Sequence, residues 1–506
     1  MFICMKFSVR KGDLSKEPCD LLVLNAFEGF KTFGGATASV DKAMGGLLLT
    51  LAQEESFRAK AETSFMLYTH GMIPAKRILL VGLGKEKDFS EESVRSAAAL
   101  SLQKARSIGA KKVVSVVHGA GHGGLHPKQT AKAIIEGMML GVYEFLRHKS
   151  SKISKKNPDE IILLTHNGQI TTQVLNGIKL GEIFANATII ARDLVNEPAQ
   201  TLRPIDLVNR TKAMVKATEG KIQMRIYNKT QLEKMGAGGL LGIAQGSDHE
   251  PFLVHMIYKP SKAKKKYAFV GKAITFDSGG LSLKPAEFME NMKEDMAGAA
   301  SVIGAMSALP LLAPSIEVHG IYGVCENMVS GRSIRPGDVV VAMNKKTIEV
   351  TNTDAEGRVT LADTLSYAVK QKPDMIIDLA TLTGACMVAL GDEIIGMFSN
   401  DDKVAQNILE AAKLAGESCW RLPLVPQYRK TLESKIADLN NVSGLKRKGG
   451  AITAALFLEE FVAQTPWAHL DIAGPAFAER PLNTYTPYGA SGFGVRTLLE
   501  LVRNAS

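Results

Sequence analysis

KKKYAFVGKAITFDSGGLSLKPAEFMENMKEDMAGAASVIGAMSAL, residues 264–309, is the stretch that decides the fold class. Its first part, 264–277, is an apolar run of strand length that ends on an acidic residue. Its last part, 295–309, is rich in Ala and Gly and has the length of a helix. Further strands are predicted at 316–327, 338–343 and 374–380, and a further helix at 358–371. Strands that alternate with helices are typical of an α/β fold.

The first 170 residues repeat this alternation on a smaller scale. Strands are predicted at 19–27, 77–84, 111–119 and 160–166, and helices at 90–109 and 128–148, the first of them capped by Ser90. A helical pattern at 171–194 then ends before Pro198 and Pro204. We therefore expect three parts: an N-terminal α/β domain over 1–170, a linker helix and loop over 171–204, and a second α/β domain over 205–506.

Composition narrows the class of protein. The chain has 506 residues, of which 45% are hydrophobic and 22% charged, as in ordinary globular proteins. Its five cysteines are scattered and form no C-x-x-C pair, which argues against a disulfide framework and favours a reducing cytoplasm. No apolar run approaches the roughly 20 residues that span a bilayer, and the N-terminus lacks a signal-peptide core. A cytoplasmic protein that does not enter the membrane is expected.

Charge is spread unevenly along the chain. Residues 1–182 contain 25 Lys and Arg against 17 Asp and Glu, whereas 183–506 contain 36 against 34. A basic first segment can attract nucleic acid through its phosphates. The alternative is a solvated surface that happens to be basic, and the sequence leaves both interpretations open.

One glycine motif invites a nucleotide-binding interpretation. Residues 119–124, GAGHGG, fit the pattern G-x-G-x-x-G after a strand and before a helix. The acidic residue expected about 20 positions later is missing, which favours a structural glycine loop. His118, His122 and His126 are interpreted as loop histidines rather than metal ligands. The chain has no H-E-x-x-H, G-x-S-x-G or P-loop motif.

Charged residues gather in two stretches, 271–302 and 352–363. Lys272 and Asp277 lie on or at the end of an apolar strand, where an uncompensated charge costs several kcal/mol. Asp295 stands where a helix begins, and Asp354 and Glu356 precede another helix. Because ligands bind at the strand ends of open α/β sheets, these segments are candidates to converge there.

Such convergence would bring four carboxylates together. Two unit charges ~4 Å apart repel by about 4 kcal/mol at an effective dielectric constant of 20. Shared protons or two divalent cations would relieve this repulsion, and oxygen ligands suit Zn, Mn or Mg. The alternative is that the four residues are separate helix caps and surface acids.

These stretches resemble the leucyl aminopeptidase (cytosol aminopeptidase) family of di-metal exopeptidases. The most specific match is NTDAEGR at 352–358, and further matches are GKAITFDSGG (271–280), MKEDMAGAA (292–300), ENMVSGRSIRPGDVV (326–340), TLTGA (381–385) and WAHLDIAG (467–474). The resemblance is strong over about 190–500 and weak before 180. It implies a smaller N-terminal domain similar to the macro (ADP-ribose-binding) module, and a larger C-terminal α/β catalytic domain with a central mixed sheet.

The resemblance also implies a ligand set for two metal ions, Mn or Zn. Asp277 and Glu356 would bridge the metals, Asp354 would hold the more exchangeable ion, and Lys272 and Asp295 would hold the tighter one. A lysine ligand must be a neutral amine. A metal-bridging water or hydroxide would attack the first peptide bond.

Two further residues are implied as catalytic. Lys284 would stabilise the oxyanion, and Arg358 would hold a bicarbonate or water that assists proton transfer. From the sequence alone, a salt bridge would explain Arg358 equally well.

The resemblance implies a pocket for the first side chain of the substrate. Met292, Thr381, Gly384 and Ala473 would line it and favour Leu or Met, and the Leu382 carbonyl would bind the substrate. Each is also an ordinary core or turn residue. Glu294 departs from the family's usual apolar or aromatic residue.

Finally, the resemblance implies partners. Peptides would be the substrates, and the chain would assemble as a homohexamer. DNA binding by the basic N-terminal domain stays open, and the rival hypothesis is a DNA-binding accessory protein with a secondary enzymatic domain.

Overall fold

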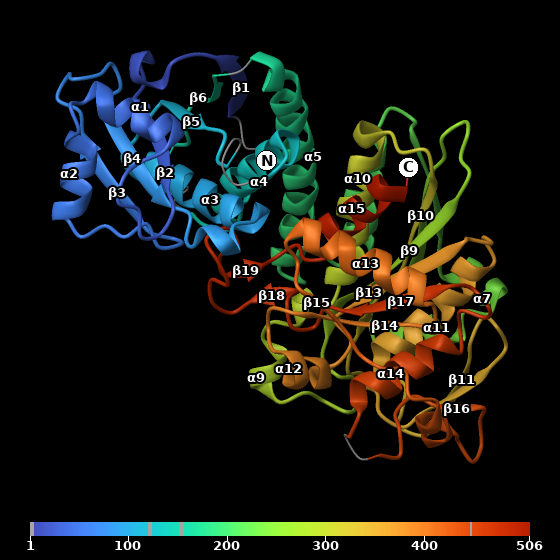
Figure 1. The fold of residues 1–506 in the computed structure, drawn as a ribbon. Helices are drawn as coiled ribbons and strands as arrows, with labels where there is room; N and C mark the ends of the chain where they lie inside the picture. Colours follow the sequence, from blue (N-terminus) through green and yellow to red (C-terminus); the bar gives the residue numbers. More distant parts are fainter. Residues whose placement is uncertain (1–4, 120–123, 151–155, 167, 446–447, 506) are drawn as a thin grey trace. The chain divides into compact units, whose positions relative to one another are not determined.

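A computed structural model describes residues 5–119, 124–150, 156–166, 168–445 and 448–505 (Figure 1). The chain divides into two compact units, Met1–Asn186 with Arg480–Pro487, and Ala187–Glu479 with Tyr488–Ser506. The boundary falls inside helix α5 (Thr171–Asn196). Each unit contains a sheet with helices against it, so the predicted α/β fold class with two domains is confirmed.

The N-terminal unit has a six-stranded sheet in the order β1-β6-β5-β2-β4-β3, with β3 antiparallel to β4 and the other neighbours parallel. The strands are β1 (Lys6–Lys11), β2 (Leu21–Ala26), β3 (Ser64–Tyr68), β4 (Arg77–Gly82), β5 (Lys112–Val116) and β6 (Glu160–Thr165). Parallel strands covered on both faces form continuous apolar runs, which made β2, β4, β5 and β6 predictable. The edge strands β1 and β3 are half-exposed and were not predicted.

The N-terminal unit also contains helices α1 (Gly35–Ala43), α2 (Leu47–Glu54), α3 (Glu91–Ser107) and α4 (Pro127–Gly141), and the first part of α5. Ser90 occupies the predicted N-cap position of α3, but its side chain makes no capping hydrogen bond. Helix α4 ends at Gly141, seven residues before the predicted end.

The C-terminal unit is built on an eight-stranded mixed sheet in the order β15-β14-β17-β13-β9-β10-β8-β7. Its strands are β7 (Ile222–Tyr227), β8 (Phe252–Tyr258), β9 (Lys266–Asp277), β10 (Glu317–Asn327), β13 (Met375–Ala380), β14 (Ile395–Ser399), β15 (Cys419–Arg421) and β17 (Trp467–Asp471). β9 pairs in parallel with both β10 and β13, and β13 pairs in parallel with β17. The carboxyl ends of these four strands therefore point to one edge of the sheet.

Two long helices pack against β9, α10 (Ala297–Leu312) and α11 (Glu356–Val369) (Figure 1). A Cβ built on Gly271 would lie 2.4 Å from the Cα of Ala299 in α10. A Cβ built on Gly357 in α11 would lie 2.5 Å from Cε of Lys272. Because successive strand residues face opposite sides, α10 and α11 cover opposite faces of β9.

Shorter elements complete the C-terminal unit. The helices are α6 (Pro204–Lys216), α7 (Lys229–Met235), α8 (Gly238–Ala244), α9 (Ala286–Met289), α12 (Gly384–Leu390), α13 (Asp402–Ala415), α14 (Gly450–Glu459) and α15 (Val495–Ala505). The strands are β11 (Asp338–Val341), β12 (Thr347–Val350), β16 (Leu439–Asn440), β18 (Phe477–Ala478) and β19 (Gly489–Ala490).

Two helical stretches have the length and composition to cross a membrane, Gly168–Asn196 and Ala286–Leu312. Of their apolar windows, 61% and 78% respectively are buried inside the protein. Apolar core helices pass the same test of length and composition.

Candidate metal and catalytic site

The predicted charged residues lie where strands end and helices begin at one edge of the mixed sheet. Asp277 is the last residue of β9, and Asp295 follows a short 3-10 turn, Met292–Glu294, two residues before α10. Asp354 lies between β12 and α11, and Glu356 is the first residue of α11. The chain thus delivers four carboxylates to the edge where α/β sheets bind ligands.

Lys272 joins the carboxylates of two different segments. Its Nζ lies 2.7 Å from Oδ1 of Asp295 and 2.9 Å from Oε1 of Glu356. It also donates a hydrogen bond of 2.8 Å to the carbonyl of Thr381, which follows β13. The side chain is only 4% exposed. Glycine at position 357 leaves the space through which this side chain passes, because a Cβ there would overlap it.

Lys284 joins the other two carboxylates. Its Nζ lies 2.9 Å from Oδ2 of Asp277 and 2.5 Å from Oδ1 of Asp354. Asp277 is further held by Asn327 at the end of β10, whose Nδ2 donates to Oδ1 at 2.8 Å, and by the N–H of Gly279 at 2.9 Å. The structure therefore brings together all four predicted carboxylates, each in contact with one of two lysines.

Buried charges in this cluster shift one another's pKa. Burial raises the pKa of Asp277 to about 6, and the nearby Glu356 charge adds to the rise. Burial opposes the charge of Lys272, but Asp295 and Glu356 outweigh it and raise the lysine pKa above its usual range. Burial likewise opposes the charge of Glu356, yet Lys272 and Lys284 lower its pKa. Burial also raises the pKa of Asp295 well above its usual range, and in the cluster four acidic side chains outnumber two lysines.

The donor set suits a divalent cation. One carboxylate oxygen from each of Asp277, Asp354 and Glu356 lies within 4.8 Å of the others. The second oxygen of Asp295, Oδ2, is buried and has no hydrogen-bond partner among the described residues. An unsatisfied buried carboxylate oxygen is costly, and hard cations bind such oxygens. These residues therefore fit a metal site.

Arg358 lies two residues beyond Glu356 in α11 and is buried. Its Nη1 donates to the carbonyl of Asn441 at 3.0 Å, and its Nε has no hydrogen-bond partner in the described part of the chain. Burial lowers its pKa to about 10, so the group still carries charge at neutral pH. No ion pair with an acidic side chain holds Arg358 among the described residues, so the salt-bridge explanation fails there.

The predicted substrate-pocket residues other than Met292 follow β13 and β17. Thr381 donates its hydroxyl to Oδ1 of Asp295 at 2.8 Å. Backbone N–H groups of Leu382 and Ala473 both donate to Oδ1 of Asp471, at 3.2 and 3.1 Å. Asp471, which the sequence analysis did not single out, thus ties the ends of the two strands together.

Gly384 opens α12 directly after its N-cap, Thr383, and Met292 begins the turn before Asp295. Neither makes a described hydrogen bond to the carboxylates. Glu294 belongs to the same turn, where burial and then Glu479 raise its pKa to about 8.

Asn327 and Asn441 were also missed, because a lone amide carries little signal in sequence. Asn327 does have one detectable feature, since it is a polar residue at the end of the apolar run 316–327 and pairs in register with Asp277.

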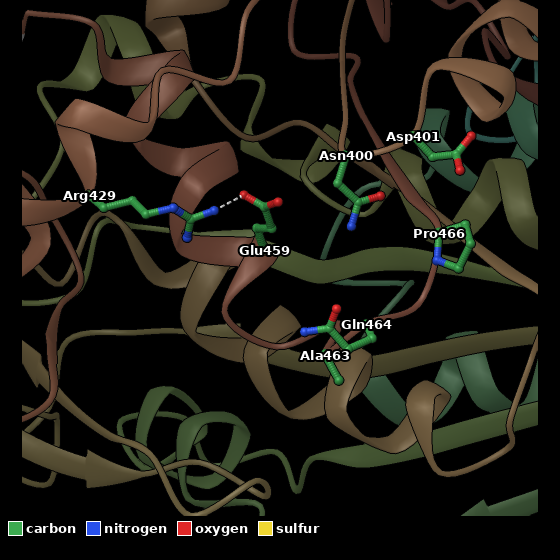
Figure 2. Close-up of a pocket in the computed structure, with 7 residues that line it drawn as sticks. All are labelled: Asn400, Asp401, Arg429, Glu459, Ala463, Gln464 and Pro466. Carbon is green, nitrogen blue, oxygen red and sulfur yellow. Dashed lines mark hydrogen bonds and ion pairs between the residues drawn. The ribbon is translucent and has the colours of Figure 1, made fainter.

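Another hollow in the C-terminal unit, about 420 Å³ in volume, contains none of the predicted site residues. Figure 2 shows Asn400, Asp401 and the ion pair of Arg429 with Glu459 in its wall. The glycine motif at 119–124 is described at Gly119 and Gly124, and 120–123, which include His122, lie outside the described residues. His118 is fully buried rather than a loop histidine at the surface.

Known proteins resemble both units. Residues 189–499 match the catalytic domain of the cytosol aminopeptidase family, and residues 23–152 match its N-terminal domain. A probable cytosol aminopeptidase of Alkaliphilus oremlandii is 41% identical over 502 residues, and one of Aquifex aeolicus is 43% identical over 505, each with 99% of both chains covered.

Solved structures agree with these matches. The bottromycin maturation enzyme BotP in complex with Mn has a TM-score of 0.85 at 36% identity, covering 96% of this chain and 99% of that one. A tomato leucine aminopeptidase variant has a TM-score of 0.89 at 35% identity, covering 99% and 96%. The resemblance inferred from the sequence motifs is confirmed, and this chain belongs to the cytosol aminopeptidase family of metal-dependent aminopeptidases.

Proposed function

We propose that the domain assigned to 205–506 releases N-terminal residues from peptides with two divalent metal ions, and that the carboxylate cluster holds both. The observation that carries this proposal is the meeting of Asp277, Asp295, Asp354 and Glu356 around two lysines. Asp277 and Glu356 would bridge the metals, Asp354 would serve one ion, and Asp295 with Lys272 the other. Bound metals would supply an activated water and polarise the scissile carbonyl.

Lys272 would lose a proton when it binds a metal ion. Beside Asp295 and Glu356 it is an ammonium group, and a metal ligand must be a neutral amine. Metal uptake is then coupled to proton release. The identity of the metal is proposed as Mn or Zn; Mn is the ion in the BotP structure.

Lys284 would stabilise the oxyanion that forms at the scissile carbonyl. Burial opposes its charge, but Asp277 and Glu356 raise its pKa, so the ammonium group persists at neutral pH. Its side chain is 15% exposed, the more accessible of the two lysines. A charged donor aimed at developing negative charge is the usual means of such stabilisation.

Arg358 would hold a bicarbonate or a water that assists proton transfer. Its unpartnered Nε is a buried donor, and an anion there would satisfy it. The unpartnered oxygen of Asp295 would accept a hydrogen bond from the free α-amino group of the substrate, which would restrict cleavage to the first residue.

We further propose a preference for Leu- or Met-like first residues. Met292, Thr381, Gly384 and Ala473 would form a small apolar wall, and the carbonyl of Leu382 would accept a hydrogen bond from the substrate. A homohexamer in the cytoplasm is proposed from the family alone. DNA binding by the basic N-terminal unit, or a primary role as a DNA-binding accessory protein, is the rival proposal that the charge of 1–182 favours.

Metal analysis of the purified protein tests the central proposal. Two equivalents of Mn or Zn per chain are expected, with leucyl-anilide hydrolysis lost on chelation and restored on re-addition. Full turnover in metal-free protein would refute it. Gel shifts over a salt series test the rival, which requires an affinity for DNA that falls steeply with salt.

A further inference from the structure

A buried aspartate and a buried histidine lie side by side on neighbouring strands of the C-terminal sheet. Asp378 of β13 pairs in register with His469 of β17, and both side chains are fully buried. Oδ1 of Asp378 lies 2.6 Å from Nδ1 of His469, and its Oδ2 accepts a hydrogen bond of 2.7 Å from Nε1 of Trp467. Neither the aspartate nor the histidine belongs to the carboxylate cluster, and the proposed function leaves both without a role.

The hydrogen bond to Asp378 decides which nitrogen of His469 carries the proton. A carboxylate can only accept, so Nδ1 of the neutral imidazole donates to it. Nε2 is then a hydrogen-bond acceptor with a bare lone pair. It is buried and has no hydrogen-bond partner among the described residues. A buried polar atom is costly without a partner, so we expect a donor to approach Nε2.

Strand register places His469 on the face of the sheet that α11 covers. Asp378 pairs with Val270 of β9 on one side and with His469 on the other, so these three side chains point to the same face. Val270 precedes Lys272 by two residues, and the side chain of Lys272 lies against the first turn of α11. His469 therefore lies on the same side of the sheet as that turn, which also carries Arg358.

Arg358 supplies the complementary group. Its Nε is a buried donor without a hydrogen-bond partner in the described part of the chain, whereas Nε2 of His469 is a buried acceptor. Burial opposes the charge of His469, but Asp378 outweighs it and raises the pKa of the imidazole, and the Arg358 charge offsets part of that rise. Asp471 also faces both groups, but its two oxygens already accept hydrogen bonds from the loops that follow β13 and β17.

We propose that His469, oriented by Asp378, is a positioning residue for the group that Arg358 holds, and that this group donates a hydrogen bond to Nε2 of His469. The inference rests on the proposed function, in which Arg358 holds a bicarbonate or a water. A ligand that accepts from Arg358 and donates to His469 must carry a proton, which excludes carbonate and sulfate. The buried charge of Arg358 favours an anion over a neutral water, so the structure points to bicarbonate.

Proton NMR of the full-length protein tests this contact without using activity. The proton between Nδ1 of His469 and Asp378 lies in a short hydrogen bond to a carboxylate, and such protons resonate far downfield of the amide protons. Its loss in His469→Gln assigns the resonance. Bicarbonate added to the protein in carbonate-free buffer should shift this resonance, whereas chloride or sulfate at the same ionic strength should not.

Asp378→Asn is the most informative variant, because it moves the proton of His469 and changes little else. Asparagine can accept from Trp467 through Oδ1 and must donate to Nδ1 of His469 through its amide, so the ring proton moves to Nε2. Nε2 then donates where it had accepted. Bicarbonate should raise kcat for leucyl anilide in the parent. In Asp378→Asn we expect kcat at least tenfold lower, KM within twofold, and no response to bicarbonate.

Two further variants separate positioning from packing. The parent should lose kcat as pH falls through the pKa of His469, because a protonated Nε2 no longer accepts. His469→Gln keeps an acceptor without a titrating group, so its kcat should exceed that of Asp378→Asn and lack this acid limb. His255→Gln is the matched control at an equally buried histidine, which contacts His319 and Tyr367 instead. It should keep kcat, the pH profile and the bicarbonate response within twofold of the parent.

Three results would overturn the proposal: a downfield resonance that bicarbonate does not move, Asp378→Asn with kcat within twofold of the parent at equal metal content, and an unchanged acid limb in His469→Gln. If Asp378→Asn does not fold, the NMR titration of the parent decides. A parent without metal-dependent hydrolysis of leucyl anilide would contradict the proposed function instead, and the resonance would still report whether bicarbonate reaches His469.

Discussion

The two units place their candidate sites at the same end of a sheet, but the side chains at the two sites differ in type and charge. Both sites lie at the carboxyl ends of parallel strands. In the C-terminal unit that edge carries four acids and two lysines, whereas the N-terminal unit has a cavity of about 610 Å³ there, lined by the first turn of α1, aromatic rings and no Lys or Arg. Sheet topology therefore places both candidate sites at the ends of parallel strands, and the side chains at those ends give the two sites different charge.

The largest effect is expected from removing charge at the centre of the acidic cluster. Glu356→Gln should lower kcat/KM for leucyl anilide by about 10⁴-fold or more, because the proposed metal pair would lose a ligand. Glu349→Gln, a change of the same kind in β12 outside the cluster, should leave kcat/KM within twofold. Steady-state kinetics with metal content measured in parallel checks this, and near-normal turnover by Glu356→Gln contradicts the ligand assignment.

A smaller effect is expected at Lys284. Replacing it with Ala should reduce kcat by about 10²–10³-fold, the usual loss for one donor to an oxyanion, while KM changes little. A rise in KM with kcat unchanged would mean that Lys284 only binds substrate. Because Lys284 also contacts Asp277 and Asp354, the metal content of the variant must be matched to the parent before the comparison.

Each unit also contains a buried histidine that resists protonation, and this gives a pH dependence. Burial lowers the pKa of His118 to about 4 and that of His255 to about 3. Unfolded chains take up these protons near pH 6.5, so stability falls as pH drops from 6.5 toward the folded pKa values. His118 alone accounts for about 3 kcal/mol over this window, at 1.36 kcal/mol per pKa unit.

Denaturant unfolding at pH 7, 6, 5 and 4 measures this fall. His118→Gln should remove the loss of stability that His118 causes on acidification and leave the loss that His255 causes. A parent whose stability is flat between pH 6.5 and 4 would show that neither histidine is held neutral.

The smallest effect is expected at Gly357, where a methyl group would press on Lys272. Gly357→Ala should destabilise the folded state by about 1–3 kcal/mol, the range for overpacking a core. Gly331→Ala is the control, since a Cβ there meets nothing within 4 Å. Urea unfolding compares the two, and equal stabilities would mean that the lysine side chain moves aside freely.

The sequence predicted the acidic residues of the site, but it did not predict the residues that surround them. Asp277 could be placed because an acid at the end of an apolar strand is costly without a partner. Asn327 and Asp471 could not, since their roles arise from neighbouring strands that are distant in sequence. For the same reason, the sequence did not predict which acids Lys272 and Lys284 contact. Ion pairs with these lysines relieve part of the repulsion among the acids, in addition to any bound cation.

Similar limits apply to the fold. Central strands such as β2 and β4 were predictable, because burial on both faces makes them uniformly apolar. Edge strands β1 and β3 have mixed burial, and helices α1 and α2 are only 9 and 8 residues long. The N-terminal cavity depends on α1, so it had no signature beyond the glycine motif.

Asp471 has one more consequence. It accepts hydrogen bonds from the backbone N–H groups of Leu382 and Ala473 and, at 2.6 Å, from the hydroxyl of Thr383, and so cross-links the loops that follow β13 and β17. If these loops form the proposed substrate pocket, a new substrate preference should arise by exchange of their side chains, with the hydrogen bonds to Asp471 kept. Insertions that remodel either loop would break these hydrogen bonds, and a mutant library that varies loop length here should yield few active clones.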